Sequence, residues 1–252
     1  MAVDARLHVN PTGELLEAAR DCEADVFFDW YGNSRAQLEE EYGPYEDASV
    51  FLALEDSAGD VVATMRLIAP VSDAGLKALT DVGREPWKVD GYRAARAAGL
   101  DLATTWEIAT LGSRHRQGSA RIRNSLALYH GYGVLARVNA MSAFVAILDE
   151  RVRRLLDMIG LTTHPLPGTA PGHYLGSEAS TPVYGVNARM ADRQRREHPD
   201  SFALVAMGLG LDGIDVPPDD AFRLFGRQSV ASQAWLTPAS VLDSPMPERA
   251  ER

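Results

Sequence analysis

The stretch of sequence that decides the fold runs from Trp106 to Leu135 and reads WEIATLGSRHRQGSARIRNSLALYHGYGVL. Residues 106–111 alternate and include β-branched side chains, which predicts a strand, while 122–135 carry apolar residues at helical spacing. Between them lies a loop of arginines and glycine. A strand that leads through such a turn into a helix is suited to bind an anion, because free backbone N–H groups and the positive end of the helix dipole meet there.

Arginine side chains add full charges to this predicted anion site. They are Arg114, Arg116, Arg121 and Arg123. We therefore expect the loop to hold a phosphate group of a ligand, and we expect Glu107 on the preceding strand to serve the chemistry. The candidate ligand-binding residues are Leu111, Ser113, Arg114, Arg116, Gly118, Ser119, Ala120 and Arg121.

The composition excludes several other classes of protein. The 252 residues are 46% hydrophobic and 24% charged, and no run of eighteen apolar residues predicts a membrane span. The formal net charge of −10 argues against nucleic acid as a partner. A single cysteine, Cys22, excludes an internal disulfide, and the six histidines lack metal-ligand spacing, so we expect no metal site. With no signal peptide visible, we expect a cytoplasmic protein.

The order of predicted elements gives the fold class. Helices are predicted at 13–25, 34–41, 122–135 and 149–159, and strands at 49–55, 61–67, 106–111, 139–148 and 181–188. This order predicts an α/β (α+β) fold, a mixed central sheet flanked by helices. We divide the chain into a domain at 1–190 and a C-terminal helical and irregular extension at 191–252, whose proline-rich end beyond about residue 240 we expect to be disordered.

The order of elements and the central strand, loop and helix resemble the GNAT superfamily of N-acyltransferases. Those proteins bind donor phosphates in a loop of pattern Arg/Gln-x-x-Gly-x-Gly/Ala. In this chain Gly118 and Ala120 occupy the glycine and the small final position. His115 stands at the first position, flanked by Arg114 and Arg116, which would supply the charge.

A second resemblance, over about residues 19–187, is to the acyl-homoserine-lactone synthase and long-chain N-acyl amino acid synthase branch. The motifs that occur in that family's order are VFF, EEEYGPYED, TMRLIAP, WEIATLGS, RLLDMIGL and HYLGSEASTPVY. The resemblance implies catalytic roles for Arg66 and Glu107, and it makes Glu46 the second acid of a paired-acid motif. Ala109-Thr110 replaces the Ser-Arg that follows the family's strand glutamate, so the acceptor stays open.

We therefore expect an N-acyltransferase that uses acyl-CoA or an acyl carrier protein as donor, with no permanently bound cofactor, and the amine of an amino acid or similar metabolite as acceptor. An acetyl-CoA-dependent acetyltransferase and a non-catalytic acyl-binding module are the alternatives. The candidate substrate-binding residues are Phe27, Phe28, Trp30, Glu46 and Phe144. Met141 and Met158 join Phe144 as a candidate acyl tunnel, although core packing explains the same residues.

The sequence leaves two roles open, that of Glu107 and that of the proton donor to the leaving thiolate. Glu107 is the base that takes a proton from the acceptor amine, or a surface-facing strand residue paired with an arginine such as Arg66, and the two interpretations can both be true. The leaving thiolate would take its proton from Tyr174, Tyr184 or water.

Overall fold

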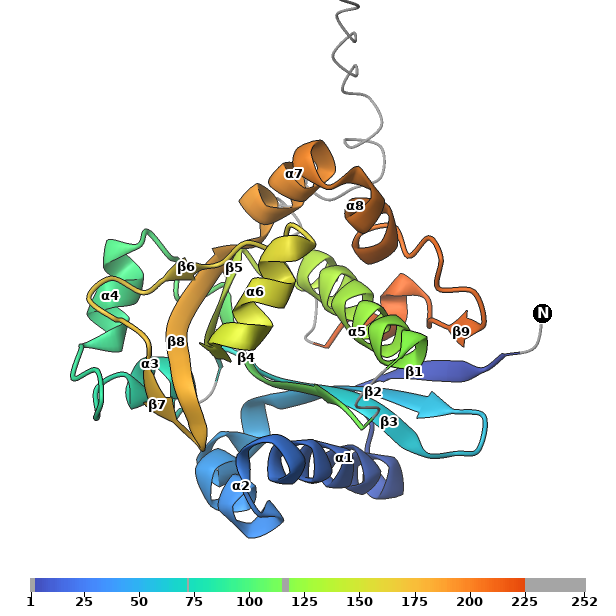
Figure 1. Ribbon diagram of the computed structural model, residues 1–252, viewed down its shortest axis with the longest axis horizontal. Helices are drawn as coiled ribbons and strands as arrows, with labels where there is room; N and C mark the ends of the chain where they lie inside the picture. The colour runs from blue at the N-terminus through green and yellow to red at the C-terminus, as the bar shows by residue number, and fades with distance from the viewer. Residues whose placement is uncertain (1–2, 72, 115–117, 225–252) are drawn as a thin grey trace, which may run out of the picture.

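The computed structural model describes residues 3–71, 73–114 and 118–224. The strands of this part span Ala5–Val9 (β1), Ser49–Asp56 (β2), Val61–Ile68 (β3), Thr105–Ser113 (β4), Ala143–Asp149 (β5), His164–Pro165 (β6), Gly172–Tyr174 (β7), Ser177–Val186 (β8) and Ile214–Asp215 (β9). They form one sheet in the order β6-β8-β5-β4-β3-β2-β1-β9, with β7 paired to β8 (Figure 1).

The sheet opens between the neighbouring strands β4 and β5. β4 and β5 run parallel and pair only from Thr105 opposite Ala143 to Glu107 opposite Val145. On its other side β4 pairs antiparallel with β3, and the register shifts where Arg66 lies opposite Thr110 and Leu67 opposite Ile108. Ala109 is therefore the extra residue of a β-bulge, a feature that redirects side chains next to binding sites.

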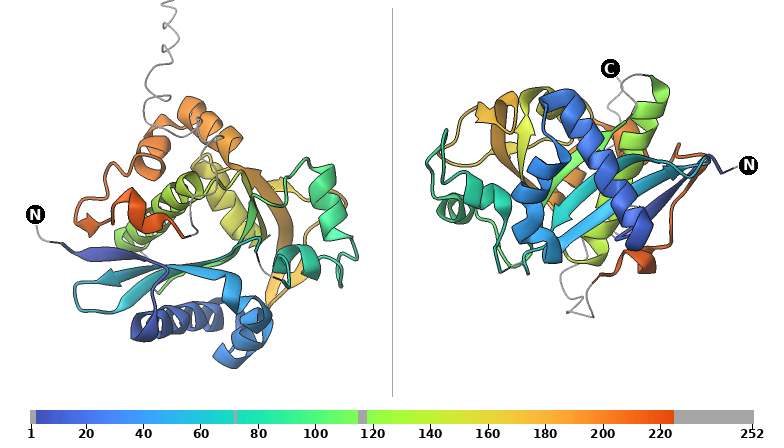
Figure 2. Two further views of the ribbon diagram at one scale, coloured as in Figure 1. Left: turned by 180° about the vertical axis from the view of Figure 1, so that it is seen from behind. Right: turned by 90° about the horizontal axis from the view of Figure 1, so that it is seen from below.

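Helices cover both faces of the sheet. Figures 1 and 2 show α1 and α2 on one face and α5 to α8 on the other, with α3 and α4 beside β7 and β8. The helices span Gly13–Tyr31 (α1), Arg35–Tyr42 (α2), Lys77–Asp81 (α3), Gly91–Ala97 (α4), Ser119–Val138 (α5), Glu150–Met158 (α6), Asn187–Glu197 (α7) and Pro199–Val205 (α8), with 3₁₀ turns at Gly43–Ala48 (η1) and Asp219–Phe222 (η2). This arrangement confirms the predicted fold class.

Local sequence accounts for where the first two helices begin and end. Ser34 caps α2, because its hydroxyl accepts the backbone N–H of Gln37 while the Gln37 side chain accepts the N–H of Ser34. α1 continues six residues past the predicted end at Asp25 and stops at Gly32, whose φ of 75° only glycine adopts readily. The sequence missed β1, β6, β7 and β9, since strands of two to five residues are too short for alternation to be seen.

The described part of the C-terminal extension packs against the same core as the rest. β9 pairs with β1, and Phe222 of η2 is fully buried. The Asn139 side chain, just after α5, donates to the Phe222 carbonyl (2.7 Å) and accepts the Leu224 N–H (3.1 Å). The division at residue 190 stays a prediction, and the end of the chain expected to be disordered lies outside the described residues.

Candidate functional site

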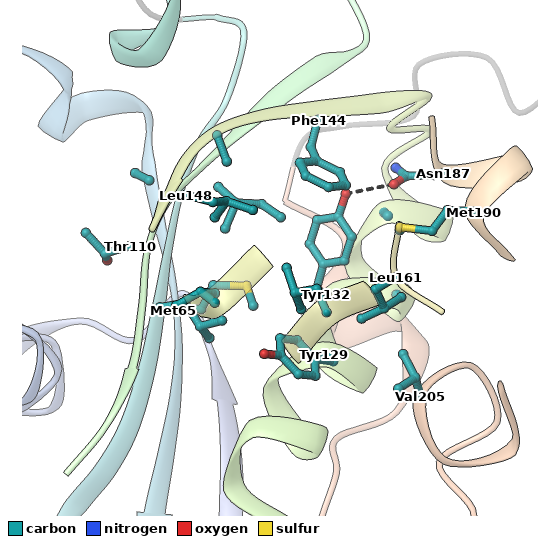
Figure 3. A pocket seen from close by; sticks show the side chains of 18 of the residues that line it. Met65, Thr110, Tyr129, Tyr132, Phe144, Leu148, Leu161, Asn187, Met190 and Val205 are labelled. Atoms are coloured by element: carbon teal, nitrogen blue, oxygen red, sulfur yellow. Dashed lines mark hydrogen bonds between the residues drawn. The ribbon is translucent and has the colours of Figure 1, made fainter. Parts of the chain in front are cut away.

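An apolar cavity of about 180 Å³ opens on the α5 face of the sheet, where β4 and β5 separate. Figure 3 shows Phe144 and Leu148 of β5, Tyr129 and Tyr132 of α5, and Val205 of α8 around it. Ile108 and Ala109 at the bulge of β4 also line it. A cavity with such walls suits apolar ligands.

Tyr132 contributes a polar group to the cavity wall. Its hydroxyl donates to Asn187 Oδ1 at 2.8 Å, and Asn187 in turn donates to the Met141 carbonyl at 2.9 Å (Figure 3). Burial raises the pKa of Tyr132 well above its usual value, so the phenol stays neutral. The pair therefore adds no charge to the wall.

A second, charged pocket of about 250 Å³ lies on the opposite face of the sheet, between α1, α2 and β3. Carboxylates and guanidinium groups alternate around it. Its charged lining residues are Glu17, Arg20, Glu23, Arg35, Glu39, Glu46 and Arg66. Such a pocket suits a small ligand that carries charges of both signs, because each ligand charge can meet an opposite one.

Arg66 and Glu23 form the buried centre of the charged pocket. Arg66 Nη2 lies 2.7 Å from Glu23 Oε2, and Arg66 Nε lies 3.0 Å from Glu23 Oε1. Arg66 Nη1 also contacts Glu46 Oε2 at 3.1 Å, and Glu46 binds Arg20. Burial acts to lower the pKa of Arg66, but the Glu23 carboxylate raises it further, so its pKa lies above the usual value.

The sequence interpretation missed Glu23, and it offered Arg66 as the partner of Glu107, which is wrong. Glu23 is buried on the face of α1 that also buries Ala19, Cys22 and Val26. An acid inside a buried helical stripe needs a partner, so the spacing alone could have marked it.

Thr110 lies between the two pockets. Its hydroxyl donates to Glu23 in the charged pocket, while the residue also borders the apolar cavity. Figure 3 shows the Thr110 side chain across the β4 ribbon from Tyr132 and Phe144. The bulge at Ala109 is therefore part of a thin wall with an apolar cavity on one side and fixed charges on the other.

Glu107 lies buried on β4 beside the short helix α3. Its Oε2 accepts the backbone N–H of Ala78 at 2.8 Å. Burial raises the pKa of Glu107 to about 8, although the hydrogen bond from Ala78 and the nearby Lys77 ammonium act to lower it. Glu107 is thus no surface-facing residue. It is outside the lining of the two pockets, and its predicted role as the base stays a prediction.

The two tyrosines considered as proton donors lie apart from the apolar cavity. Tyr174 donates to Asp81 Oδ2 at 2.6 Å and accepts from Lys77 Nζ at 3.0 Å. The ring of Tyr184 packs against His164, with centroids 5.5 Å apart. Neither is among the residues that line the cavity, so both roles stay predictions.

The described part of the predicted donor loop lies next to the apolar cavity. Leu111 lines the cavity, and Ser113 and Arg114 line a third hollow beside the end of α1. Arg114 Nη2 pairs with Asp25 Oδ2 at 2.8 Å. Gly118 precedes α5 with a φ of 91°, which only glycine adopts readily.

The rest of this loop is described in part. His115 and Arg116 lie outside the described residues, and of Ser119, Ala120 and Arg121 the structure describes the backbone. Arg123 points away to the ion pair of its Nη1 with Asp4 Oδ2 at 3.2 Å. Phosphate binding here stays a prediction.

The predicted substrate-binding residues fall into three places. Phe27 and Phe144 line the apolar cavity, and Glu46 lines the charged pocket. Phe28 and Trp30 line the third hollow and are 63% and 41% exposed.

The residues predicted for an acyl tunnel do not all lie together, and the tunnel stays a prediction. Phe144 lines the cavity, whereas Met141 is buried outside its lining and Met158 is 66% exposed. The main wall that the sequence did not predict comes from α7 and α8, through Met190, Ala191, Gln194, Val205 and Ala206.

The described residues contain neither a cluster of metal ligands nor a membrane-spanning helix. Within residues 3–71, 73–114 and 118–224, no group of three or more histidine, cysteine, aspartate or glutamate side chains is placed to hold a metal ion. None of the helices in this part has both the length and the apolar character needed to cross a membrane.

Comparison with known proteins finds relatives by structure alone. No protein-family model and no curated protein sequence matches the chain. FeeM, an N-acyl amino acid synthase from uncultured soil microbes, superposes with a TM-score of 0.56 at 13% identity, over 75% of this chain and 93% of its own. BjaI, a CoA-dependent acyl-homoserine lactone synthase solved with MTA, superposes with a TM-score of 0.55 at 14% identity, over 87% of this chain and 96% of its own. The chain therefore has the GNAT-type fold of these synthases, as the sequence resemblance implied.

Proposed function

We propose that the chain is an N-acyltransferase that moves an acyl group from a CoA or acyl-carrier-protein thioester to the amine of an amino acid or related small metabolite. The observation that carries this proposal is the pair of pockets on the two sides of β4. One is apolar and suits an acyl chain, while the other is charged and suits a zwitterion. Thr110, whose hydroxyl donates to Glu23, lies between the two pockets, and the two substrates would react beside it.

The charged pocket would bind the acceptor. Glu46 is the better contact for an ammonium group, because its side chain is 36% exposed, whereas that of Glu23 is 2% exposed. Arg20, with its side chain 25% exposed, would meet a carboxylate of the acceptor. FeeM is an N-acyl amino acid synthase, and its fold likeness agrees with an acceptor of this class.

The acyl thioester would lie in the opening between β4 and β5. In the transfer the amine nitrogen attacks the thioester carbonyl carbon, the carbon–sulfur bond breaks, and the thiol leaves with a proton. A backbone N–H near the bulge of β4 would stabilise the oxyanion. Glu107 would accept the ammonium proton through a water molecule, because a pKa of about 8 is well matched to this task near neutral pH.

The test is a panel of donors and acceptors. The purified protein is incubated with acyl-CoA and acyl-carrier-protein donors, acetyl-CoA included, and with free amino acids. Thiol release is followed, and products are identified by mass spectrometry. We expect acyl-amine products with one acceptor class, and the two donor arms tell CoA from carrier protein.

Substitution of Glu46 tests the place of the acceptor. We expect Glu46→Gln to raise KM for the amine about tenfold, the loss of one charge-assisted hydrogen bond, with KM for the donor unchanged. Glu40→Gln, an exposed acid on α2, is the matched control and should behave as wild type.

Three outcomes would overturn the proposal. Thiol release without an acyl-amine product would indicate a thioesterase. Acyl binding without any turnover would indicate a binding module. A preference for acetyl-CoA would indicate an acetyltransferase, which the size of the apolar cavity speaks against.

A further inference from the structure

We propose that α7 and α8 form the far wall of the acyl cavity and thereby set the length of the acyl chain. We expect a chain of about six to eight carbons, by comparison with a cavity of about 150 Å³ that holds benzene. This inference rests on the proposed function, because it takes the ligand of the cavity to be the acyl chain of the donor. Its test measures ligand binding and needs no enzyme activity.

The far wall comes from α7 and α8, the two helices that follow β8. The sheet and α5 line one side of the cavity, while Met190 of α7 and Val205 of α8 line the other. Figure 3 shows Met190 and Val205 facing Met65 and Leu148 across the cavity, with Tyr132 between them. A chain that entered beside β4 would therefore end against α7 and α8.

Specific contacts hold this wall in place. His130 Nδ1 of α5 lies 2.9 Å from the Val205 carbonyl. Gln194 is buried in α7, and its Nε2 donates to the Ile159 carbonyl at 2.7 Å. Because both helices are tied by hydrogen bonds to elements of the main domain, their side chains present a fixed limit to the cavity.

The volume gives the expected length. The cavity measures about 180 Å³, slightly more than the engineered cavity of about 150 Å³ that binds benzene, so it holds about six to eight carbons. Each methylene that enters an apolar site adds about fourfold in affinity until the wall is reached. Longer chains gain nothing further.

Two substitutions move the wall in opposite directions. Met190→Ala removes the end of a lining side chain and should extend the limit by about two carbons, since three heavy atoms leave the cavity. Val205→Phe fills the cavity and should shorten the limit by a similar length. Met207→Ala is the matched control, because Met207 also lies in the extension but is 50% exposed and outside the lining.

The measurement is displacement of a fluorescent fatty acid from the full chain by saturated fatty acids of graded length. We expect affinity to rise with each added carbon and to level off at six to eight for wild type and for Met207→Ala. The level should move to longer chains in Met190→Ala and to shorter chains in Val205→Phe. Circular dichroism and a thermal melt of each variant confirm that it is folded.

Failure of this inference and failure of the proposed function are distinguishable. If all variants level off at the same length, α7 and α8 do not limit the chain, even where transfer is observed. If the limit moves as expected but no acyl-amine product forms with any donor, the wall assignment holds and the enzyme proposal fails. A folded Met190→Ala with an unchanged limit would by itself overturn the assignment.

Discussion

Replacement of Glu107 by glutamine removes a buried carboxyl group of β4 whose pKa is raised by burial. The Glu107 side chain is buried and accepts the Ala78 N–H at 2.8 Å. Glutamine has nearly the same shape and keeps a carbonyl oxygen for that bond. The variant therefore isolates the cost of a buried negative charge, which wild type bears at high pH and the variant does not.

The sign and size of the effect follow from the pKa. The folded-state pKa of Glu107, about 8, lies above its ordinary value of 4.5, so its contribution to stability is fully present below pH 4.5 and is lost as the pH rises through 8. The full loss is about 5 kcal/mol, from a shift of about three and a half pH units at 1.36 kcal/mol each. Between about pH 5.5 and 8 the loss is about 3 kcal/mol.

The assay is urea unfolding of both proteins across this pH range. We expect Glu107→Gln to match wild type only below about pH 4.5, and its advantage in the free energy of unfolding to grow by about 3 kcal/mol between pH 5.5 and pH 8. Glu178→Gln is the control, because it removes one exposed carboxylate of β8 and shows the effect of losing a charge that is not buried. Parallel profiles for wild type and Glu107→Gln would refute the reasoning, because Glu107 would then ionise alike in the folded and unfolded chain.

Two further predictions concern stability. Arg66→Met leaves Glu23 buried without its ion pair and should lower the free energy of unfolding by about 3–5 kcal/mol, measured in urea. The double variant Arg66→Met/Glu23→Leu should recover part of this loss. A cost below about 1 kcal/mol for the single variant would contradict a buried pair. Phe222→Ala should cost about 3–5 kcal/mol, because the side chain is fully buried under α5. An unchanged melting curve for Phe222→Ala would show that η2 is not part of the core.

The elements that carry the candidate site were predictable where they depend on a local pattern. The strand, loop and helix from β4 to α5 were found from alternation, glycine and helical spacing. The catalytic roles of Arg66 and Glu107 came from the family resemblance and stay predictions. The partners of these residues were not predictable in the same way. Glu23 lies 43 residues from Arg66 and 87 from Thr110, and the sequence contains no signal for contacts at that separation.

The sequence by itself determined the class of fold, because hydrophobic periodicity and turn residues are local and survive in a single chain. It also determined that an apolar strand, a basic loop and a helix follow one another. Only the tertiary structure decided that β4 separates an apolar cavity from a charged pocket, because strand pairing and the bulge at Ala109 set which side each residue faces. It likewise decided that α7 and α8 wall the cavity, although the residues from 191 on were predicted as an extension, since the packing of α8 against α5 depends on the whole fold.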